Sequence, residues 1–467
     1  MPGWRVLEEM SKRLNHIESN IANLRGDVAN LNGKALTLVL IFLISFSVKI
    51  LPLLLGCRVP FGWLDTAYHI STALDVKEGN FKSLFHPWWH IPNHIFEYGV
   101  DLIDRNSKSF FYPPLLHVLL ALSMVFTHPG VAAIITISFL YSLSVISIFL
   151  LCKSHGLSGS SSLISSLIVG SSSSLTYSQN FGFWTFSIAL IFSILSYSFL
   201  QFYLKNEESR MLNFSLVFGS LATLTNWLFG AALLISGVLS LNVGCKKFLL
   251  YFGSLYILFL LFFLTFTDTL SYEFTYFHQI FLETPVLYLL MVVGWVLAIK
   301  KHKKNLFIHL LPPLVLALMV AYYILNIKIP LADMLQFTLP FFTAFYASHI
   351  YQFLRERARV IYLILIILLL IVQFSRILDI QLTTKPSLSN EQFDSLLNLR
   401  STFSPNSTTI LGMEGGENYW ITLVSKDSKI INPFSTTSIQ LKNFQIYLIK
   451  PIDNYFVLTS DESKTLH

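Results

Sequence analysis

The sequence predicts an all-α, multi-pass membrane protein of about eleven transmembrane helices, because apolar runs long enough to cross a bilayer recur along it. Of its 467 residues, 54% are hydrophobic and only 12% are charged, and the mean hydropathy is +0.61. A soluble domain carries about 25% charged residues, so this composition indicates a chain embedded in lipid. The runs are continuously apolar instead of alternating, which favours helices over strands.

The predicted spans lie, in chain order, at residues 35–55, 131–152, 159–175, 182–204, 211–226, 228–243, 248–266, 285–300, 306–325, 334–353 and 359–375. Basic connectors follow every second span, and the N-terminal segment is also basic. Since cytoplasmic loops are enriched in Lys and Arg, this pattern predicts a cytoplasmic N-terminus and an extracytoplasmic C-terminus in the cell membrane. The formal charge of +6 is explained by these connectors, and we expect no nucleic-acid partner.

One apolar segment, residues 113–127, is too short to be assigned with the others. It is bounded by a proline pair at one end and by His128-Pro129-Gly130 at the other. If it crossed the bilayer, every later basic connector would move to the outer side. We therefore predict an interfacial or half-inserted helix, and a short true span is the alternative.

Two appendages flank the predicted bundle, which covers residues 34–378. The arm at residues 1–33 has a heptad seam, made by Leu7, Met10, Leu14, Ile17, Ile21, Leu24, Val28 and Leu31. This pattern predicts a coiled coil through residues 5–32, formed with a second copy or with a partner helix; an amphipathic helix on the membrane is the alternative. The tail at residues 379–467 alternates a helical stretch with short β-like runs, which predicts a small extracytoplasmic α/β domain.

The predicted topology places a long outer loop at residues 56–130, and this loop opens with an acidic motif. Asp65 and His69 are four residues apart, so on a helix they share one face. A carboxylate beside an imidazole could deprotonate an acceptor hydroxyl, and Asp65 could hold a divalent cation such as Mg²⁺ or Mn²⁺. The alternative is the start of an interfacial helix, with Asp65 as its cap and Tyr68 as an aromatic belt residue.

Other polar residues on the predicted outer side have two interpretations each. Asn226 and Trp227 could line a sugar pocket, or could form a turn with an aromatic anchor. His278 lies in a long connector that could fold over a lipid donor or be simply hydrated. Within the spans almost nothing is ionisable, which argues against ion-coupled transport; Lys49 lies near the outer end of the first span and could extend its amine toward water.

The order of these motifs resembles the GT-C class of integral-membrane glycosyltransferases, which use lipid-phosphate-linked sugars. The matching features are the acidic motif after the first span, Pro87-Trp88, the segment Tyr112 to Leu115, the polar second outer loop from Tyr177 to Gly182, and the outer tail. The resemblance covers almost the whole chain after the heptad arm. It is distantly similar to oligosaccharyltransferase catalytic subunits and protein mannosyltransferases.

The resemblance implies an inverting hexosyl transfer on the outer face, from a polyprenyl- or dolichyl-phosphate sugar to a glycan, glycoprotein or other acceptor. Asp65 is the position that matches the catalytic carboxylate, with His69 beside it. The implied substrate-binding residues are Tyr68, Trp88, Tyr112, His117, Gln179, Asn180, Asn226, Trp227, His278, Lys328 and Arg376. The implied partners are the lipid-linked donor and membrane lipid.

The sequence also departs from that class. Many relatives have two adjacent acidic residues where this chain has Leu64-Asp65, and metal-dependent relatives have carboxylates where it has Gln179 and Asn180. The expected arginine near Ala332-Asp333 is absent, and Lys328 or Arg376 could replace it. These departures keep two alternatives open: a catalytically silent membrane scaffold or receptor assembled through the coiled coil, and a lipid or glycan flippase.

Overall fold

The computed structural model describes residues 33–62, 64–84, 114–239, 245–266, 285–301 and 337–403, with short stretches of the tail from residue 409 to residue 466. The predicted coiled-coil arm and the span at 306–325 lie outside the described residues. A helix over residues 33–49 begins the described chain and breaks at Ile50, after which α2 (Leu51–Leu54) continues it for one turn. Pro52 lacks a backbone N–H and favours a break at this point.

Three short helices follow. They are α3 (Leu64–Lys77), η1 (Phe81–Leu84) and α5 (Leu115–Met124). At a rise of 1.5 Å per residue, the ten residues of α5 extend about 15 Å, half of a ~30 Å hydrocarbon core. The helix is therefore too short to span, as the sequence predicts for this segment, and it buries Leu116, His117 and Leu120 against its neighbours.

The bundle itself contains ten described helices between residues 129 and 383. They are α6 (Pro129–Ser154), α7 (Gly159–Gly170), α8 (Ser173–Asn180), α9 (Trp184–Asn206), α10 (Ser209–Thr225), α11 (Trp227–Leu239), α12 (Cys245–Phe266), α13 (Pro285–Lys301), α15 (Leu339–Phe353) and α16 (Glu356–Thr383). Among the described helices, α6, α9 and α16 are long and apolar enough to cross a membrane. The total of eleven spans stays a prediction.

The predicted span at 159–175 is wrong in its outer half. Helix α7 ends at Gly170, and α8 starts at Ser173 as a separate helix whose eight residues are all buried. The side chain of Ser172 accepts a hydrogen bond from the backbone N–H of Leu175 at 3.1 Å and so caps α8. Consecutive serines favour a cap over a continuous helix, because their hydroxyls compete for backbone groups. Residues 176–180 of the predicted polar connector thus belong to a buried helix.

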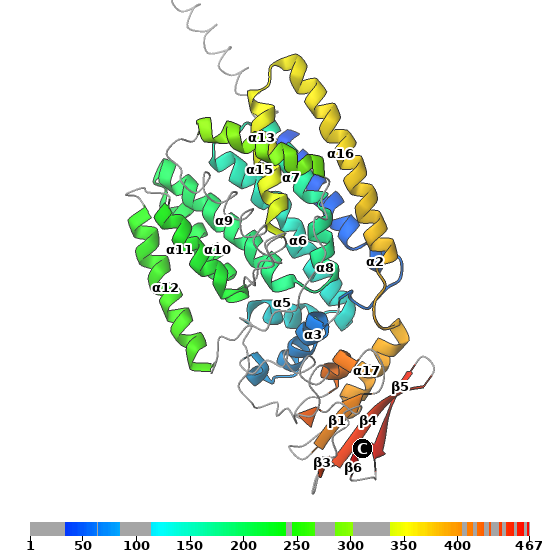
Figure 1. The fold of residues 1–467 in the computed structure, drawn as a ribbon. Coiled ribbons are helices and arrows are strands. Elements are labelled where there is room, and N and C mark those ends of the chain that lie inside the picture. Colours follow the sequence, from blue (N-terminus) through cyan, green and yellow to red (C-terminus); the bar gives the residue numbers. More distant parts are fainter. Residues whose placement is uncertain are drawn as a thin grey trace, which may run out of the picture.

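Helix α16 extends well beyond the predicted span at 359–375. Its 28 residues correspond to about 42 Å, so the predicted domain boundary at residue 378 lies inside this helix. Figure 1 shows α16 crossing the whole bundle and ending beside α17. Its buried residues recur every three or four positions, at Tyr362, Ile366, Leu369, Gln373, Ile377 and Gln381. Large apolar side chains such as Ile361, Ile364 and Leu368 are exposed on its other faces, as expected for a helix in contact with lipid.

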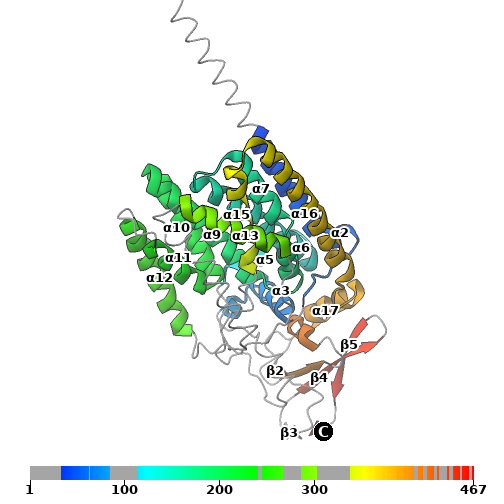
Figure 2. The ribbon, with the colours of Figure 1, turned by 45° about the horizontal axis from the view of Figure 1, so that its top comes forward.

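The tail begins with α17 (Asn390–Thr402), which starts with a capping box between Ser389 and Gln392. After it come β1 (Thr409–Met413), η3 (Asn418–Leu423), β2 (Lys429–Ile430), β3 (Ile439–Gln440), β4 (Gln445–Ile452), β5 (Tyr455–Asp461) and β6 (Thr465–Leu466). Four strands form a sheet in the order β2-β1-β4-β5, in which β1 is parallel to β2 and β4, and β4 and β5 are antiparallel. Figure 2 shows the strands gathered at one end of the bundle, next to α3 and α17.

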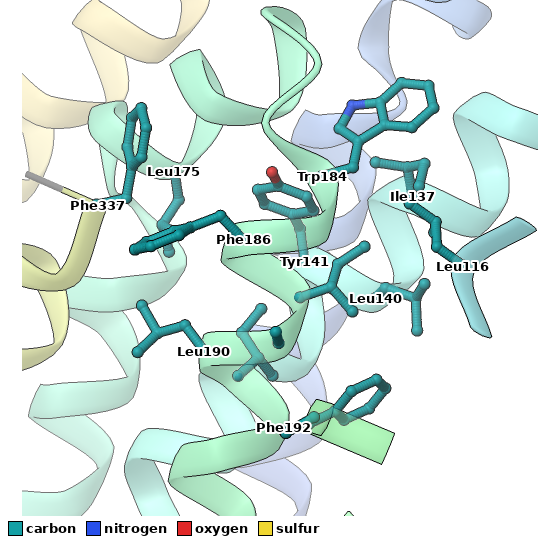
Figure 3. Close-up of a cluster of buried hydrophobic side chains, with 14 of the residues drawn as sticks. Leu116, Ile137, Leu140, Tyr141, Leu175, Trp184, Phe186, Leu190, Phe192 and Phe337 are labelled. Atoms are coloured by element: carbon teal, nitrogen blue, oxygen red, sulfur yellow. The ribbon is translucent and has the colours of Figure 1, made fainter. Parts of the chain in front are cut away.

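The core lies between α6, α7 and α9, and Figure 3 shows part of it. Tyr141 and Trp184 are among its largest fully buried side chains. The hydroxyl of Tyr141 lies 2.9 Å from Ser178 Oγ, which ties α6 to α8. The buried helices α8 and α9 thus hold polar groups beneath α3, at the end of the bundle where the tail lies.

Candidate active site

A buried histidine pair joins α3 to α5. His69 Nδ1 and His117 Nε2 are 2.9 Å apart, and both side chains are fully buried. One ring nitrogen must donate and the other accept, so one proton lies between the two rings. The His69 ring stacks on Trp184, with ring centroids 5.6 Å apart, and Tyr68 meets the His117 ring edge-on at 5.4 Å. Aromatic packing on both sides fixes the orientation of the pair.

Both imidazoles are neutral at physiological pH. Burial lowers the pKa of His69 well below its ordinary value, and the adjacent His117 lowers it further. Burial likewise lowers the pKa of His117, to about 3. A base this weak is poorly matched to proton abstraction near neutral pH. The pair is therefore suited to orienting the helix and its neighbours, while the role of base falls to another group.

Asp65 lies one helical turn before His69, in the first turn of α3, where the structure describes the backbone only. The turn before it depends on Gly62, whose φ is +123°. A Cβ at this position would clash with Thr66 Oγ1 and lie 3.3 Å from the carbonyl oxygen of Asn180. The start of α3 therefore lies directly against the end of α8. The first and second predicted outer loops, which are distant in sequence, meet here.

The two amides of α8 are held by hydrogen bonds from opposite sides. Gln179 Nε2 donates to the carbonyl oxygen of Lys49 at 3.2 Å and to Ser138 Oγ at 3.0 Å. Asn180 Nδ2 donates to Gln381 Oε1 of α16 at 3.2 Å. Trp184 Nε1 donates to the carbonyl oxygen of Gln179 at 2.7 Å. The tryptophan that stacks on His69 is thus also fixed to α8.

A small cavity of about 20 Å³ lies beside these amides, room for about one water molecule. Lys49, Gln179, Asn180 and Trp184 are among the residues that line it. Gln179 Oε1 is buried and accepts no hydrogen bond from the described residues. Among those residues no cluster of three histidine, cysteine or acidic side chains could hold a metal ion. Gln179 and Asn180 beside a lysine do not by themselves form a site for a divalent cation, which prefers several carboxylate oxygens. The cation expected at Asp65 stays a prediction.

No protein-family model and no curated protein sequence matches this chain. Among solved structures, the apo oligosaccharyltransferase of Archaeoglobus fulgidus is similar over 86% of this chain and 65% of its own, with a TM-score of 0.55 at 12% identity. The chain shares the fold of an archaeal oligosaccharyltransferase. A structure of the A. fulgidus oligosaccharyltransferase AglB with an inhibitory peptide and a dolichol-phosphate covers the same 86%, at TM-score 0.50 and 13% identity.

The GT-C resemblance expected from the sequence is confirmed at the level of the fold. This chain spans slightly less than two thirds of both solved oligosaccharyltransferase chains, 65% and 64% of their length. A shared fold does not carry an activity with it. The function of this GT-C-like chain depends on the residues at the start of α3 and around α8.

The structure brings together Tyr68, His69, His117, Gln179 and Asn180 of the expected substrate-binding and catalytic set. Four others, Trp88, Tyr112, His278 and Lys328, lie outside the described residues. Asn226 lies at the junction of α10 and α11, where its Oδ1 accepts a hydrogen bond from the backbone N–H of Leu228 at 3.2 Å. That is the contact of a helix cap, as in the turn interpretation of Asn226 and Trp227.

The structure shows the surroundings of two charged residues, Arg376 and Lys49, which the sequence did not predict. Arg376 is exposed on α16, whereas Gln373, Ile377 and Gln381 form the buried face of that helix. Lys49, expected to extend toward water, is only 1% exposed. Its amine turns back along the helix and donates to Ser45 Oγ at 2.7 Å, because side chains on a helix lean toward its N-terminus.

A buried ion pair that no sequence motif indicates fixes the other end of α3. Arg400 Nη2 donates to Asp75 Oδ1 at 2.6 Å, and Arg400 Nε donates to Glu78 Oε1 at 2.7 Å. Burial alone would lower the pKa of Arg400, but the two carboxylates raise it overall. Arg400 Nη1 also donates to the carbonyl oxygen of Leu423 at 2.7 Å. The tail is thus bonded to the helix that carries Asp65 and His69.

Proposed function

We propose that this chain is a membrane glycosyltransferase that moves a sugar from a polyprenyl- or dolichyl-phosphate donor to an acceptor on the extracytoplasmic face. The observation that carries the proposal is the start of α3, which bears Asp65 and lies against the end of α8 in a fold shared with an oligosaccharyltransferase. A lipid-borne donor and a water-borne acceptor can meet only where the bundle reaches the aqueous boundary. The proposed site is at that end of the bundle.

In this proposal the Asp65 carboxylate accepts the proton of an acceptor hydroxyl. The hydroxyl oxygen then attacks the anomeric carbon, and the bond from that carbon to the phosphate oxygen breaks. The electron pair leaves with the lipid phosphate, and the configuration at the anomeric carbon inverts. His69 acts as a positioning residue, because its bond to His117 and its stacking on Trp184 fix the turn of α3 that follows Asp65.

The experiment is a transfer assay with purified, reconstituted protein, radiolabelled polyprenyl-phosphate hexoses and a panel of hydroxyl acceptors. We expect Asp65→Asn to lower the rate by at least 100-fold, in line with the contribution of a general base. Asp379→Asn is the matched control, since this carboxylate lies exposed on α16. An Asp65→Asn protein that turned over like the wild type would refute the assigned base.

A catalytically silent scaffold is the second candidate. It is favoured by the α8 amides, because Gln179 and Asn180 occupy the positions of carboxylates in metal-dependent relatives and both are bonded inside the protein. Absence of turnover with every lipid-phosphate sugar, together with specific cross-linking of a partner through residues 5–32, would support this candidate over the enzyme.

A further inference from the structure

The first described helix, over residues 33–49, has an exposed apolar face. Leu36, Leu40 and Leu43 on this helix are about half exposed or more, and their spacing of four and three residues places them on one side of it. Ile364 and Leu368 on α16 are also more than half exposed. Figures 1 and 2 show the two helices side by side along one edge of the bundle. The two helices therefore present a continuous apolar surface at this edge.

A groove of about 320 Å³ lies in this surface. Its walls come from the first helix at residues 41–48, from the end of α7, and from α16 at residues 367–377. Three of the lining residues, Ser45, Gly170 and Ser171, are small. Small residues in a membrane protein let a second helix approach closely. The groove is therefore lined as expected for contact with the apolar side chains of a further helix.

The segment that precedes the first helix indicates what this further helix is. It has the heptad seam of the sequence analysis, which ends two residues before the helix begins. In the two heptads nearest the membrane, Ile21 and Val28 occupy the a positions, and Leu24 and Leu31 occupy the d positions. Branched residues at a with leucine at d favour a parallel, two-stranded coiled coil. The arm is therefore expected to bring together two parallel helices.

Charges beside the seam favour a second copy of this chain as the partner. Arg13 is at a g position, and Glu18 is at the following e position. In a parallel pair of identical strands the g residue of one faces the following e residue of the other, so the two charges are self-complementary. Packed helices lie about 8–10 Å apart. Two copies joined by the arm would therefore enter the bilayer with their first helices in contact.

We propose that two copies of this chain form a parallel dimer in the membrane, in which the groove of each copy receives the first helix of the other. A two-fold arrangement uses the same surface on both copies, so both grooves are filled at once. Leu40 and Leu43 lie next to the groove residues in the sequence, and we expect these side chains of one copy to enter the groove of the other. The dimer requires no transfer activity, and it fits the enzyme and the scaffold equally.

Disulfide cross-linking of the full chain in reconstituted bilayers tests this contact. Mild oxidation should convert most of a Leu40→Cys protein to a covalent dimer, because equivalent cysteines across a two-fold contact come within bonding distance. Leu258→Cys is the matched control, since this leucine is 63% exposed on α12, at the opposite edge of the bundle (Figure 1). The control and the wild type, with its three native cysteines, should form no covalent dimer. Equal cross-linking at positions 40 and 258 would indicate random collision and would overturn the proposal.

A second measurement separates the groove from the arm. Energy transfer between copies that carry different labels, diluted stepwise with lipid, gives the dissociation constant of the dimer. Ser171→Phe fills the groove and should raise this constant by about tenfold or more, whereas Ser171→Ala should leave it unchanged. A wild type that stays monomeric at every dilution would overturn the proposal. An unchanged dissociation constant in Ser171→Phe would overturn it as well, because the arm alone would then hold the two copies together.

Discussion

The ion pair between the tail and α3 allows the strongest prediction of stability. Arg400 is 3% exposed at its side chain and Asp75 is 2% exposed, while Glu78 is 41% exposed. Replacing Arg400 by Met would leave the Asp75 carboxylate buried without its cationic partner, although Ser83 Oγ still donates to it at 2.6 Å. Removing one partner of a buried pair costs about 3–5 kcal/mol. That is a large part of the ~5–15 kcal/mol that stabilises a typical folded protein.

The assay is thermal unfolding of the purified protein in detergent, combined with limited proteolysis of the tail. We expect Arg400→Met to lower the unfolding midpoint and to expose the tail to cleavage. The double variant Arg400→Met with Asp75→Leu should recover most of the loss, because replacing both partners by apolar groups removes the uncompensated charge. The control is Arg210→Met, whose pair with Glu208 is exposed at 80% and 42% and should contribute less than about 1 kcal/mol.

Two results would contradict the role assigned to this ion pair. If Arg400→Met were no less stable than Arg210→Met, the tail would not be held to α3 by this pair, and the assigned docking would be wrong. If the double variant lost as much as Arg400→Met alone, the loss would come from packing around the guanidinium and not from the loss of the ion pair with Asp75.

Two further predictions concern the pH and the helix packing. The pKa of His117 in the folded protein is about 3, below its ordinary value of 6.5, so the unfolded chain binds the proton more readily. The stability from His117 alone should be full above pH 6.5 and fall by about 2 kcal/mol by pH 5, and His69, whose pKa is also lowered, should add to the fall. Unfolding midpoints between pH 8 and pH 5 check this, and the fall should be much smaller in a His69→Asn, His117→Asn double variant. Gly294→Ala should destabilise the bundle, because its Cβ would overlap the backbone of Tyr346 on α15. The control Gly253→Ala meets only Leu234 Cδ2 at 3.8 Å and should be neutral or stabilising by up to about 1 kcal/mol; equal effects of the two alanines would contradict the assigned contact of α13 with α15.

Hydropathy located most of the described helices, since an apolar run of span length is a strong signal. Hydropathy could not locate the break between α7 and α8, because serine is only weakly polar on a hydropathy scale. Four successive serines therefore do not end an apolar run. The local cap of α8 by Ser172 and the bond from Asn180 to Gln381, 201 residues further along the chain, stabilise the separate helix α8.

The site residues were predictable one by one but not as contacts. His69 and His117 each followed from a motif, yet their pairing over 48 residues depends on how α5 packs on α3. Arg400 and Asp75 are 325 residues apart, and neither lies in a motif. Lys49 was visible in the sequence, but its burial depends on whether its amine turns toward water or back toward Ser45, which a one-dimensional pattern does not contain.

These contacts have a common consequence for α3, which is held at three points along its length. Gly62, just before its first turn, lies against the carbonyl oxygen of Asn180, its middle is fixed by the bond of His69 to His117, and Asp75 in its last turn is paired with Arg400 of the tail. A displacement of the tail would therefore move the helix that carries Asp65, although α17 and Asp65 lie at opposite ends of it. If the proposed chemistry is right, Arg400→Met should lower the rate of transfer even where the bundle remains folded. The combined rescue by Asp75→Leu should restore that rate together with the stability, because both losses would have one cause.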